Sequence, residues 1–246
     1  SSPSGRGWAP ASALWSLRVV WVGLAVVGSL AIADATERRG APAGTVTAVS
    51  WWLVVGVVLV ATLVPGVLSL AVVRMSAILG VGASAVALAT GASPTLGGAM
   101  AALAVATAAV ALSAEAGEAF VQGSAYGAEV RFPLRPPAAL VPAAVVSTLL
   151  WVAAVVSAVV LLADRQWALG VATAALGCAS TWWVLRAHVR LGRRWLVLVP
   201  AGLVVHDEAN LAAVREKVAA LTAGAVAPEP AGATWLDHRL VETAAD

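Results

Sequence analysis

Long apolar stretches, each long enough to cross a lipid bilayer, are the feature that most constrains how this chain can fold. A helix that crosses the roughly 30 Å hydrocarbon core needs about 20 mostly apolar residues, because each residue advances it by about 1.5 Å. The 246 residues are 61% hydrophobic and only 11% charged, whereas soluble domains are about 25% charged. These polar side chains are too few to cover a soluble globule of this size. We therefore predict an all-α polytopic membrane protein.

The apolar stretches predict about six transmembrane helices, which together form a bundle over residues 14–185. We expect the spans over residues 14–33, 47–73, 76–92, 95–113, 138–163 and 167–185. The third and fourth spans are rich in Ala and Gly, so they could instead form a re-entrant hairpin and leave four full spans. Pro65 falls inside the second expected span, and we expect it to kink that helix because proline removes a backbone hydrogen bond.

The distribution of arginine predicts the orientation of the bundle, because cytoplasmic loops of membrane proteins carry an excess of Lys and Arg. Nine arginines flank the ends that we take as inner, and three flank the outer ends. The inner set is Arg6, Arg18, Arg74, Arg131, Arg135, Arg186, Arg190, Arg193 and Arg194, and the outer set is Arg38, Arg39 and Arg165. We therefore expect a multi-pass protein of a bacterial cell (plasma) membrane, with both termini in the cytoplasm.

Two terminal segments are expected in the cytoplasm, residues 1–13 and residues 186–246. In the second, the runs Trp195–Val199 and Leu203–His206 flank a Pro-Ala-Gly sequence, which predicts a short β-hairpin. A lone two-stranded hairpin is marginally stable in water, so we expect this one to pack against another surface.

An amphipathic helix is expected directly after the β-hairpin. Asp207 is a candidate N-cap, and apolar residues recur at helical spacing as far as Leu221. The apolar face of this helix and the terminal segment that starts at Trp235 are candidate partner-docking surfaces. The residues concerned are Leu211, Val214, Val218, Leu221, Trp235 and Leu236.

Arginines near the inner membrane surface are candidate contacts for anionic lipid headgroups or for a partner protein. Four of them follow the last span and would fall close to one face if that helix continued. Two more lie in the long inner loop over residues 114–137. The set is Arg186, Arg190, Arg193, Arg194, Arg131 and Arg135. The alternative is that these arginines only anchor the topology.

Tryptophan occurs 11 times and is concentrated near the expected span ends. An indole ring has an apolar body and one N–H donor, so it favours the interface between membrane and water. We therefore expect an aromatic belt. Its members would be Trp15, Trp21, Trp51, Trp52, Trp151, Trp167, Trp182 and Trp183.

The central portions of all six expected spans lack Asp, Glu, His and Lys. Ion-coupled transporters usually keep such groups inside the bilayer, so this pattern argues against proton-coupled or sodium-coupled transport. Glu115 and Glu118 are three residues apart, so they could lie on one face of a helix, but two carboxylates are too few for most metal sites. His188, His206 and His238 belong to no Cys/His cluster. We therefore predict no catalytic residues, no metal and no cofactor.

These observations favour a non-catalytic membrane scaffold or accessory subunit, part of a membrane protein complex. Such a protein would dock its partner through the cytoplasmic C-terminal region. The alternative is a transporter, channel or lipid-handling protein without ionisable groups inside the membrane. The expected partners are membrane lipids and either a second protein or a second copy of the chain, and nucleic acid is not expected.

Overall fold

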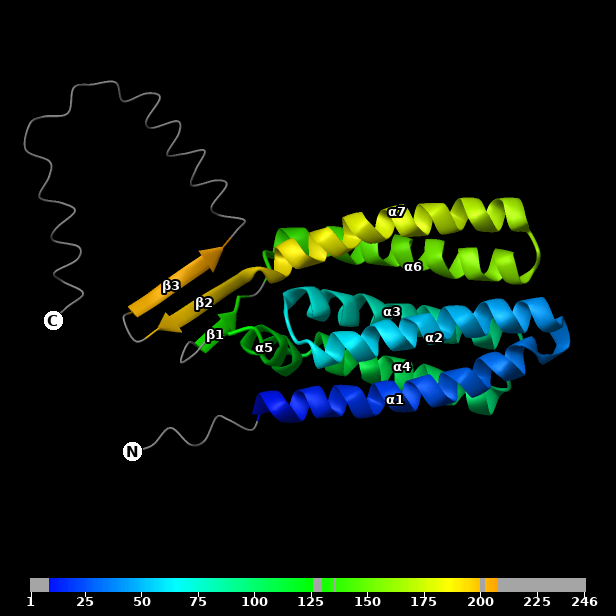
Figure 1. The fold of residues 1–246 in the computed structure, drawn as a ribbon, viewed down its shortest axis with the longest axis horizontal. Coiled ribbons are helices and arrows are strands. Elements are labelled where there is room, and N and C mark those ends of the chain that lie inside the picture. The colour runs from blue at the N-terminus through cyan, green and yellow to red at the C-terminus, as the bar shows by residue number, and fades with distance from the viewer. Residues whose placement is uncertain (1–8, 126–129, 135, 200–201, 208–246) are drawn as a thin grey trace, which may run out of the picture.

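Helices of transmembrane length dominate the computed structural model, which describes residues 9–125, 130–134, 136–199 and 202–207 (Figure 1). Six of them are long and apolar enough to cross a membrane. They are α1 (Ala9–Thr36), α2 (Ala41–Leu63), α3 (Val67–Ala89), α4 (Pro94–Leu112), α6 (Val141–Ala163) and α7 (Trp167–Gly192). The prediction of a multi-pass α-helical membrane protein with six such helices is confirmed.

The two ends of the bundle differ in what they carry, and we name them accordingly. At the turn end, short links join α1 to α2, α3 to α4, and α6 to α7. The first of these links contains the 3₁₀ helix η1 (Glu37–Arg39). At the sheet end lie the short helix α5 (Ala114–Gln122), the 3₁₀ helix η2 (Ala138–Leu140) and three strands (Figure 1).

The link between α2 and α3 departs most from the expected spans, which were residues 47–73 and 76–92. In the structure α2 ends at Leu63 and α3 begins at Val67, with Pro65 between them. Proline has no N–H to donate to the preceding turn, and its ring excludes the helical conformation at the residue before it. Val64 accordingly leaves the helix, at φ −117° and ψ 77°. Pro65 therefore separates two spans, and the predicted kink within one span is wrong.

Helices α1–α5 form a body with one shared core, and α6 and α7 lie beside it as a pair (Figure 1). The core of the body contains large buried side chains from four helices. They include Leu17, Trp21, Leu24, Val55, Val58, Met100 and Phe120. A smaller cluster joins α6 and α7 to α3, and it consists of Met75, Leu79, Trp151, Val152 and Val184.

Two buried tryptophans tie α1 to α2 by reciprocal hydrogen bonds. Trp21 Nε1 of α1 donates to the carbonyl oxygen of Val55 at 3.3 Å, and Trp51 Nε1 of α2 donates to that of Ala25 at 3.2 Å. The Trp51 ring lies against Gly28, where an added Cβ would overlap it. The missing side chain at Gly28 therefore makes room for the indole that joins the two helices.

A second pair of polar contacts joins α6 to α7. Trp151 Nε1 donates to Thr181 Oγ1 at 2.7 Å, and His188 Nε2 lies 2.7 Å from Thr148 Oγ1. The Thr148 hydroxyl already donates its hydrogen to the Ala144 carbonyl oxygen at 2.7 Å. Thr148 thus links the His188 ring to the backbone of its own helix.

The prediction that all eight tryptophans form an interfacial belt is wrong for three of them. Trp21, Trp51 and Trp151 are buried and bond across helix contacts. Trp15, Trp52, Trp167, Trp182 and Trp183 are exposed on the outside of the bundle. An indole N–H costs free energy in an apolar core unless it finds an acceptor, and these three find one on a neighbouring helix.

Several ionisable side chains lie within spanning helices on the side of the sheet end, and three of them bond to a neighbouring helix. The Arg18 guanidinium of α1 donates to the Thr62 carbonyl oxygen at 2.6 Å. Arg74 Nε of α3 donates to the Ala111 carbonyl oxygen at 3.1 Å. His188 lies on α7 because this helix continues to Gly192, beyond the expected end of the span at residue 185. These groups lie toward the helix ends, where the two arginines reach carbonyl oxygens of neighbouring helices and His188 reaches the Thr148 hydroxyl of α6.

The strands form a three-stranded antiparallel sheet in the order β1 (Val130–Pro133), β2 (Arg194–Val199) and β3 (Gly202–Asp207). Sequence analysis expected an isolated hairpin over residues 195–206 and missed β1, which the long inner loop supplies. Arg131 of β1 lies opposite Val197 of β2, and the Arg131 backbone N–H donates to Gln122 Oε1 of α5 at 2.9 Å. The sheet therefore connects the body, through α5, to the end of α7.

Replacing Gly28 tests the contact between α1 and α2. In Gly28→Ala the added methyl collides with the Trp51 indole, so we expect the free energy of unfolding to fall by about 1–3 kcal/mol, as in overpacked cores. Denaturant unfolding in detergent, followed by tryptophan fluorescence, measures this loss. The matched control is Gly56→Ala in α2, where a Cβ would meet nothing within 4 Å. Equal stability of the two variants would contradict the packing described for Gly28.

Candidate functional site

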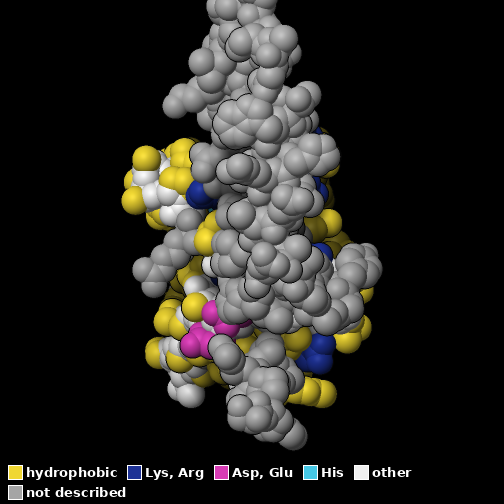
Figure 2. All heavy atoms as spheres, turned by 90° about the vertical axis from the view of Figure 1, so that its left-hand side faces the viewer, with side chains coloured by type: hydrophobic (Ala, Val, Ile, Leu, Met, Phe, Trp, Pro, Cys, Tyr) yellow, Lys and Arg dark blue, Asp and Glu magenta, His cyan; other side chains and the backbone are white. Residues whose placement is uncertain are grey.

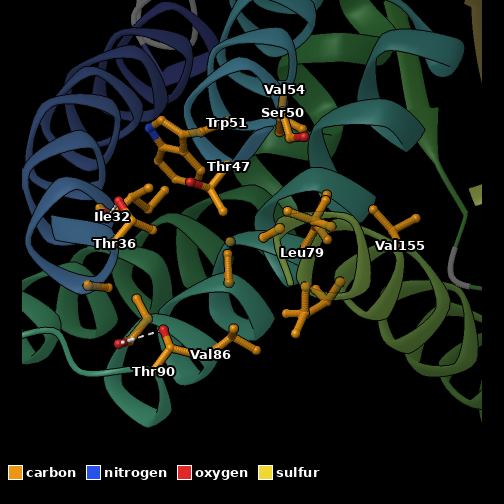
Figure 3. Close-up of a pocket in the computed structure, with 18 of the residues that line it drawn as sticks. Ile32, Thr36, Thr47, Ser50, Trp51, Val54, Leu79, Val86, Thr90 and Val155 are labelled. Atoms are coloured by element: carbon orange, nitrogen blue, oxygen red, sulfur yellow. Dashed lines mark hydrogen bonds between the residues drawn. The ribbon is translucent and has the colours of Figure 1, made fainter. Parts of the chain in front are cut away.

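A crevice with mostly apolar walls separates the body from the α6–α7 pair. Near the turn end it forms a cavity of about 110 Å³ between α1, α2, α3 and α6 (Figure 3). Toward the middle of the bundle it widens into a lateral groove of about 710 Å³ between α2, α3, α6 and α7. The turn-end cavity and the lateral groove are adjacent, since both are bordered by Ser50, Val54, Leu79, Val155 and Val159.

The walls of the crevice offer few free hydrogen-bond donors, although several hydroxyl groups line it. Thr36 Oγ1 donates to the Ile32 carbonyl oxygen at 2.8 Å, and Thr47 Oγ1 donates to that of Ala43 at 2.7 Å. Ser50 Oγ donates to the Val46 carbonyl oxygen at 2.8 Å. Each hydroxyl hydrogen is thus committed to the preceding turn of its own helix. The remaining wall is mostly Val, Leu, Ile and Ala, which suits an apolar occupant.

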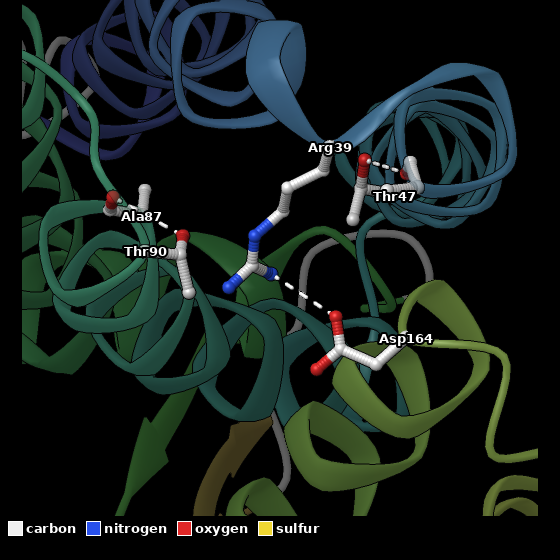
Figure 4. A network of polar contacts seen from close by, with 6 residues as sticks. Arg39, Thr47, Ala87, Thr90 and Asp164 are labelled. Carbon is white, nitrogen blue, oxygen red and sulfur yellow. Dashed lines mark hydrogen bonds and ion pairs between the residues drawn. The ribbon is translucent and has the colours of Figure 1, made fainter.

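The mouth of the cavity at the turn end is closed by an ion pair. Arg39 of η1 extends between Thr47 and Thr90 toward Asp164, and its Nη1 lies 3.5 Å from Asp164 Oδ1 (Figure 4). The two side chains are 34% and 41% exposed. Arg39 belongs to the link after α1, and Asp164 caps the C-terminal end of α6. The ion pair therefore joins the body to the α6–α7 pair across the top of the crevice.

The lateral groove opens sideways onto the outer surface of the bundle. Leu53, Val57 and Cys178 line it and are exposed. The surrounding surface is strongly apolar, with exposed side chains such as Leu63, Leu150, Leu176, Trp182 and Trp183. An apolar surface of this extent is stable only against a nonaqueous surrounding. The groove therefore faces the lipid when the helices span a bilayer.

The arginines predicted as lipid or partner contacts do not form one stripe, because α7 ends at Gly192. Arg186 and Arg190 are exposed on α7, and the Arg186 guanidinium lies 5.9 Å from the centroid of the Trp182 ring. Arg193 caps the helix and Arg194 begins β2. Arg131 joins the same sheet, where its Nη1 donates to Ser124 Oγ at 3.1 Å. The sheet end carries both basic and acidic side chains (Figure 2).

Several predicted site residues lie outside the described residues. These are Arg135 and the proposed docking residues Leu211, Val214, Val218, Leu221, Trp235 and Leu236. Glu115 and Glu118 are described, and both are exposed on α5. Within the described part of the chain, no group of three or more His, Cys, Asp or Glu side chains could hold a metal ion.

Sequence reasoning missed the two residues at the mouth of the crevice. It counted Arg39 only toward the orientation and treated Asp164 only as part of a short link. Asp164 directly follows the last residue of α6, and Arg39 ends the short 3₁₀ helix that follows α1. The opposite charges of Arg39 and Asp164 at the same expected membrane depth could have indicated an ion pair. The fold was needed to show that η1 lies next to the α6–α7 link.

Comparison with protein-family models, with curated proteins and with solved structures found no match to this chain. The fold and the crevice define a multi-pass helical membrane protein with an apolar, laterally open intramembrane site.

Cys178, the one cysteine of the chain, provides a native probe of the lateral groove. We expect a nitroxide attached to Cys178 in detergent, followed by reconstitution into liposomes, to be relaxed by oxygen and not by a water-soluble nickel chelate. The reason is that the groove faces lipid near the middle of α7. Electron paramagnetic resonance power saturation measures both accessibilities. Strong relaxation by the nickel chelate would show a water-filled groove and contradict this description.

Proposed function

We propose that this chain is a non-enzymatic, lipid-handling membrane protein that holds a lipid acyl chain in the crevice between its body and the α6–α7 pair. The observation that carries the proposal is the pair of adjacent apolar spaces formed by the lateral groove and the turn-end cavity. Its larger part has a volume of about 710 Å³, within the range of about 300–1,000 Å³ typical of ligand pockets.

The chemistry of the walls supports an acyl chain over water or an ion. A buried water needs two to four polar partners, and the lining hydroxyls described above already donate to their own helices. An ion crossing here would meet no carboxylate between the Arg39–Asp164 ion pair and Trp151, among the residues that line the crevice. An acyl chain needs only shape and dispersion contacts, and the lateral opening gives it a route from the bilayer.

A filled groove tests the proposal. Ala174 of α7 lines the lateral groove, so in Ala174→Phe the added ring occupies space that the acyl chain would use. We expect this variant to lose the most tightly retained lipid after extraction in mild detergent. Native mass spectrometry counts the retained lipids.

The matched control is Ala175→Phe, which adds the same ring to the exposed side of the same helix. We expect it to retain lipid as the unchanged protein does. If the unchanged protein retains no lipid, or if both variants retain it equally, the crevice is not a lipid site.

A second candidate function is a scaffold or accessory subunit that docks a partner at the sheet end. The observation that favours it is the three-stranded sheet, which joins residues 130–133 to residues 194–207. β1 has its outer edge bonded to Gln122, whereas β3 is the other edge of the described sheet. Edge strands expose backbone donors and acceptors that a partner strand can use.

In this proposal the sheet end faces the cytoplasm of a bacterial cell and both termini lie on that side. The arginines support the orientation. More of the described arginines lie toward the sheet end than at the turn end. Those toward the sheet end are Arg18, Arg74, Arg131, Arg186, Arg190, Arg193 and Arg194, and those at the turn end are Arg38, Arg39 and Arg165. An excess of arginine marks the cytoplasmic side of membrane proteins.

Removing residues 208–246 tests the scaffold function, because the deletion spares β3 and every spanning helix. We expect a protein that co-purifies with the full chain in mild detergent to be lost from the truncated chain, as quantitative mass spectrometry of paired purifications would show. The Ala175→Phe variant serves as the control that keeps the C-terminal region. Recovery of the same proteins with both chains would contradict docking through this region, and a co-purified partner from the extracytoplasmic side would contradict the orientation.

A further inference from the structure

We propose that the mouth of the crevice binds the headgroup of a zwitterionic phospholipid, with the phosphate on Arg39 and the amine on Asp164. This inference rests on the proposed function, because the acyl chain of that lipid would occupy the cavity and groove below. It adds the chemical class of the headgroup, which the apolar walls leave undetermined.

The depth of the ion pair fits a lipid headgroup. Arg39 lies in η1 just beyond the end of α1, and Asp164 follows the last residue of α6. The ends of spanning helices lie where the hydrocarbon core meets the headgroup region. Arg39 also borders the turn-end cavity itself, together with Thr36, Thr47 and Thr90. A lipid whose phosphate contacts Arg39 therefore has its acyl chains at the entrance of the cavity.

Both members of the ion pair retain binding capacity. A guanidinium group has five N–H donors, and its closest carboxylate contact here joins Nη1 of Arg39 to Oδ1 of Asp164 at 3.5 Å. The carboxylate of Asp164 can likewise accept several hydrogen bonds. Both side chains are about one third or more exposed, so a headgroup can reach them without displacing the helices.

Charge complementarity selects a headgroup that carries both signs. A phosphate alone would be attracted by Arg39 and repelled by Asp164, which lies beside it. A headgroup with a phosphate and an amine satisfies both partners and leaves the mouth electrically neutral. The turn end as a whole is balanced by sequence, because Asp34, Glu37 and Asp164 offset Arg38, Arg39 and Arg165.

The ion pair supplies the selectivity because the neighbouring hydroxyls cannot. Thr36 and Thr47 donate to their own helices, as described above, and Thr90 Oγ1 donates to the Ala87 carbonyl oxygen at 3.3 Å. Among the residues that line the turn-end cavity, Arg39 is the one cation. Arginine also suits phosphate, since its planar group can offer two parallel hydrogen bonds.

The test measures which headgroup the protein retains. The full chain is reconstituted into nanodiscs with equal amounts of phosphatidylethanolamine and phosphatidylglycerol, released into mild detergent, and analysed by native mass spectrometry. We expect phosphatidylethanolamine to be enriched by about three- to tenfold, a range that corresponds to one or two charge-assisted hydrogen bonds at a partly exposed site.

Arg39→Gln should lose most of the bound lipid of both kinds, because phosphate loses its cation. Asp164→Asn should bring the ratio close to one, because the repulsive carboxylate is gone.

Arg165→Gln is the control, since Arg165 lies in the same link and is not a member of the Arg39–Asp164 ion pair. We expect it to leave the lipid ratio unchanged. A preference of the unchanged protein for phosphatidylglycerol would overturn the inference. So would an ion pair that acts only as a latch, in which case Arg39→Gln and Asp164→Asn lower thermal stability without changing either the amount or the ratio of the retained lipids. In both cases lipid retention that is still sensitive to Ala174→Phe would leave the proposed function intact.

Discussion

Each polar group within a spanning helix must find its partner inside the protein, because lipid offers none. Lipid chains are also as apolar as the side chains they touch, so burial alone provides little attraction between helices. The body meets this constraint with donors that reach across to carbonyl oxygens of neighbouring helices. Trp21 and Trp51 join α1 and α2, Arg18 reaches α2, and Arg74 reaches α4. Close packing at Gly28 is what lets the first of these contacts form.

The same constraint explains why a crevice lies beside the α6–α7 pair. The hydrogen bonds of that pair mostly join α6 to α7, from Trp151 to Thr181 and between His188 and Thr148. Toward the body it presents an apolar cluster with α3 and a close contact at Gly82, where a Cβ would lie 2.7 Å from Val152 Cγ1. At the turn end the Arg39–Asp164 ion pair connects the two parts, and at the sheet end β1 does so. The pair is therefore held at its ends and at one side, and the space between these contacts is the crevice.

Sequence patterns predicted the helices of transmembrane length well, because an apolar length of about 20 residues is a local property. They misplaced the boundary at Pro65, since an uninterrupted apolar run hides the point where a proline ends one helix and the next begins. They also assigned Trp21, Trp51 and Trp151 to the interface, because composition cannot tell an indole that faces a neighbouring helix from one that faces lipid. The candidate site was the least accessible to sequence reasoning. Arg39 and Asp164 are 125 positions apart in the chain, and the paired residues of β1 and β2 are 62 to 68 positions apart, so both contacts depend on how the helices are arranged.

The arrangement also relates the two candidate functions to each other. One side of α7 borders the lateral groove, where Ala174, Cys178 and Thr181 lie. The same helix ends at Gly192, and a single residue separates it from the start of β2 at Arg194. A Cβ at Gly192 would lie 2.9 Å from Val67 Cγ1, so this end of α7 packs tightly on the start of α3. Because α7 is one continuous helix between the groove and the sheet, its position beside the crevice and the position of β2 are geometrically coupled. A lipid in the crevice and a partner on the sheet would therefore bind to two parts of one structural unit that α7 joins.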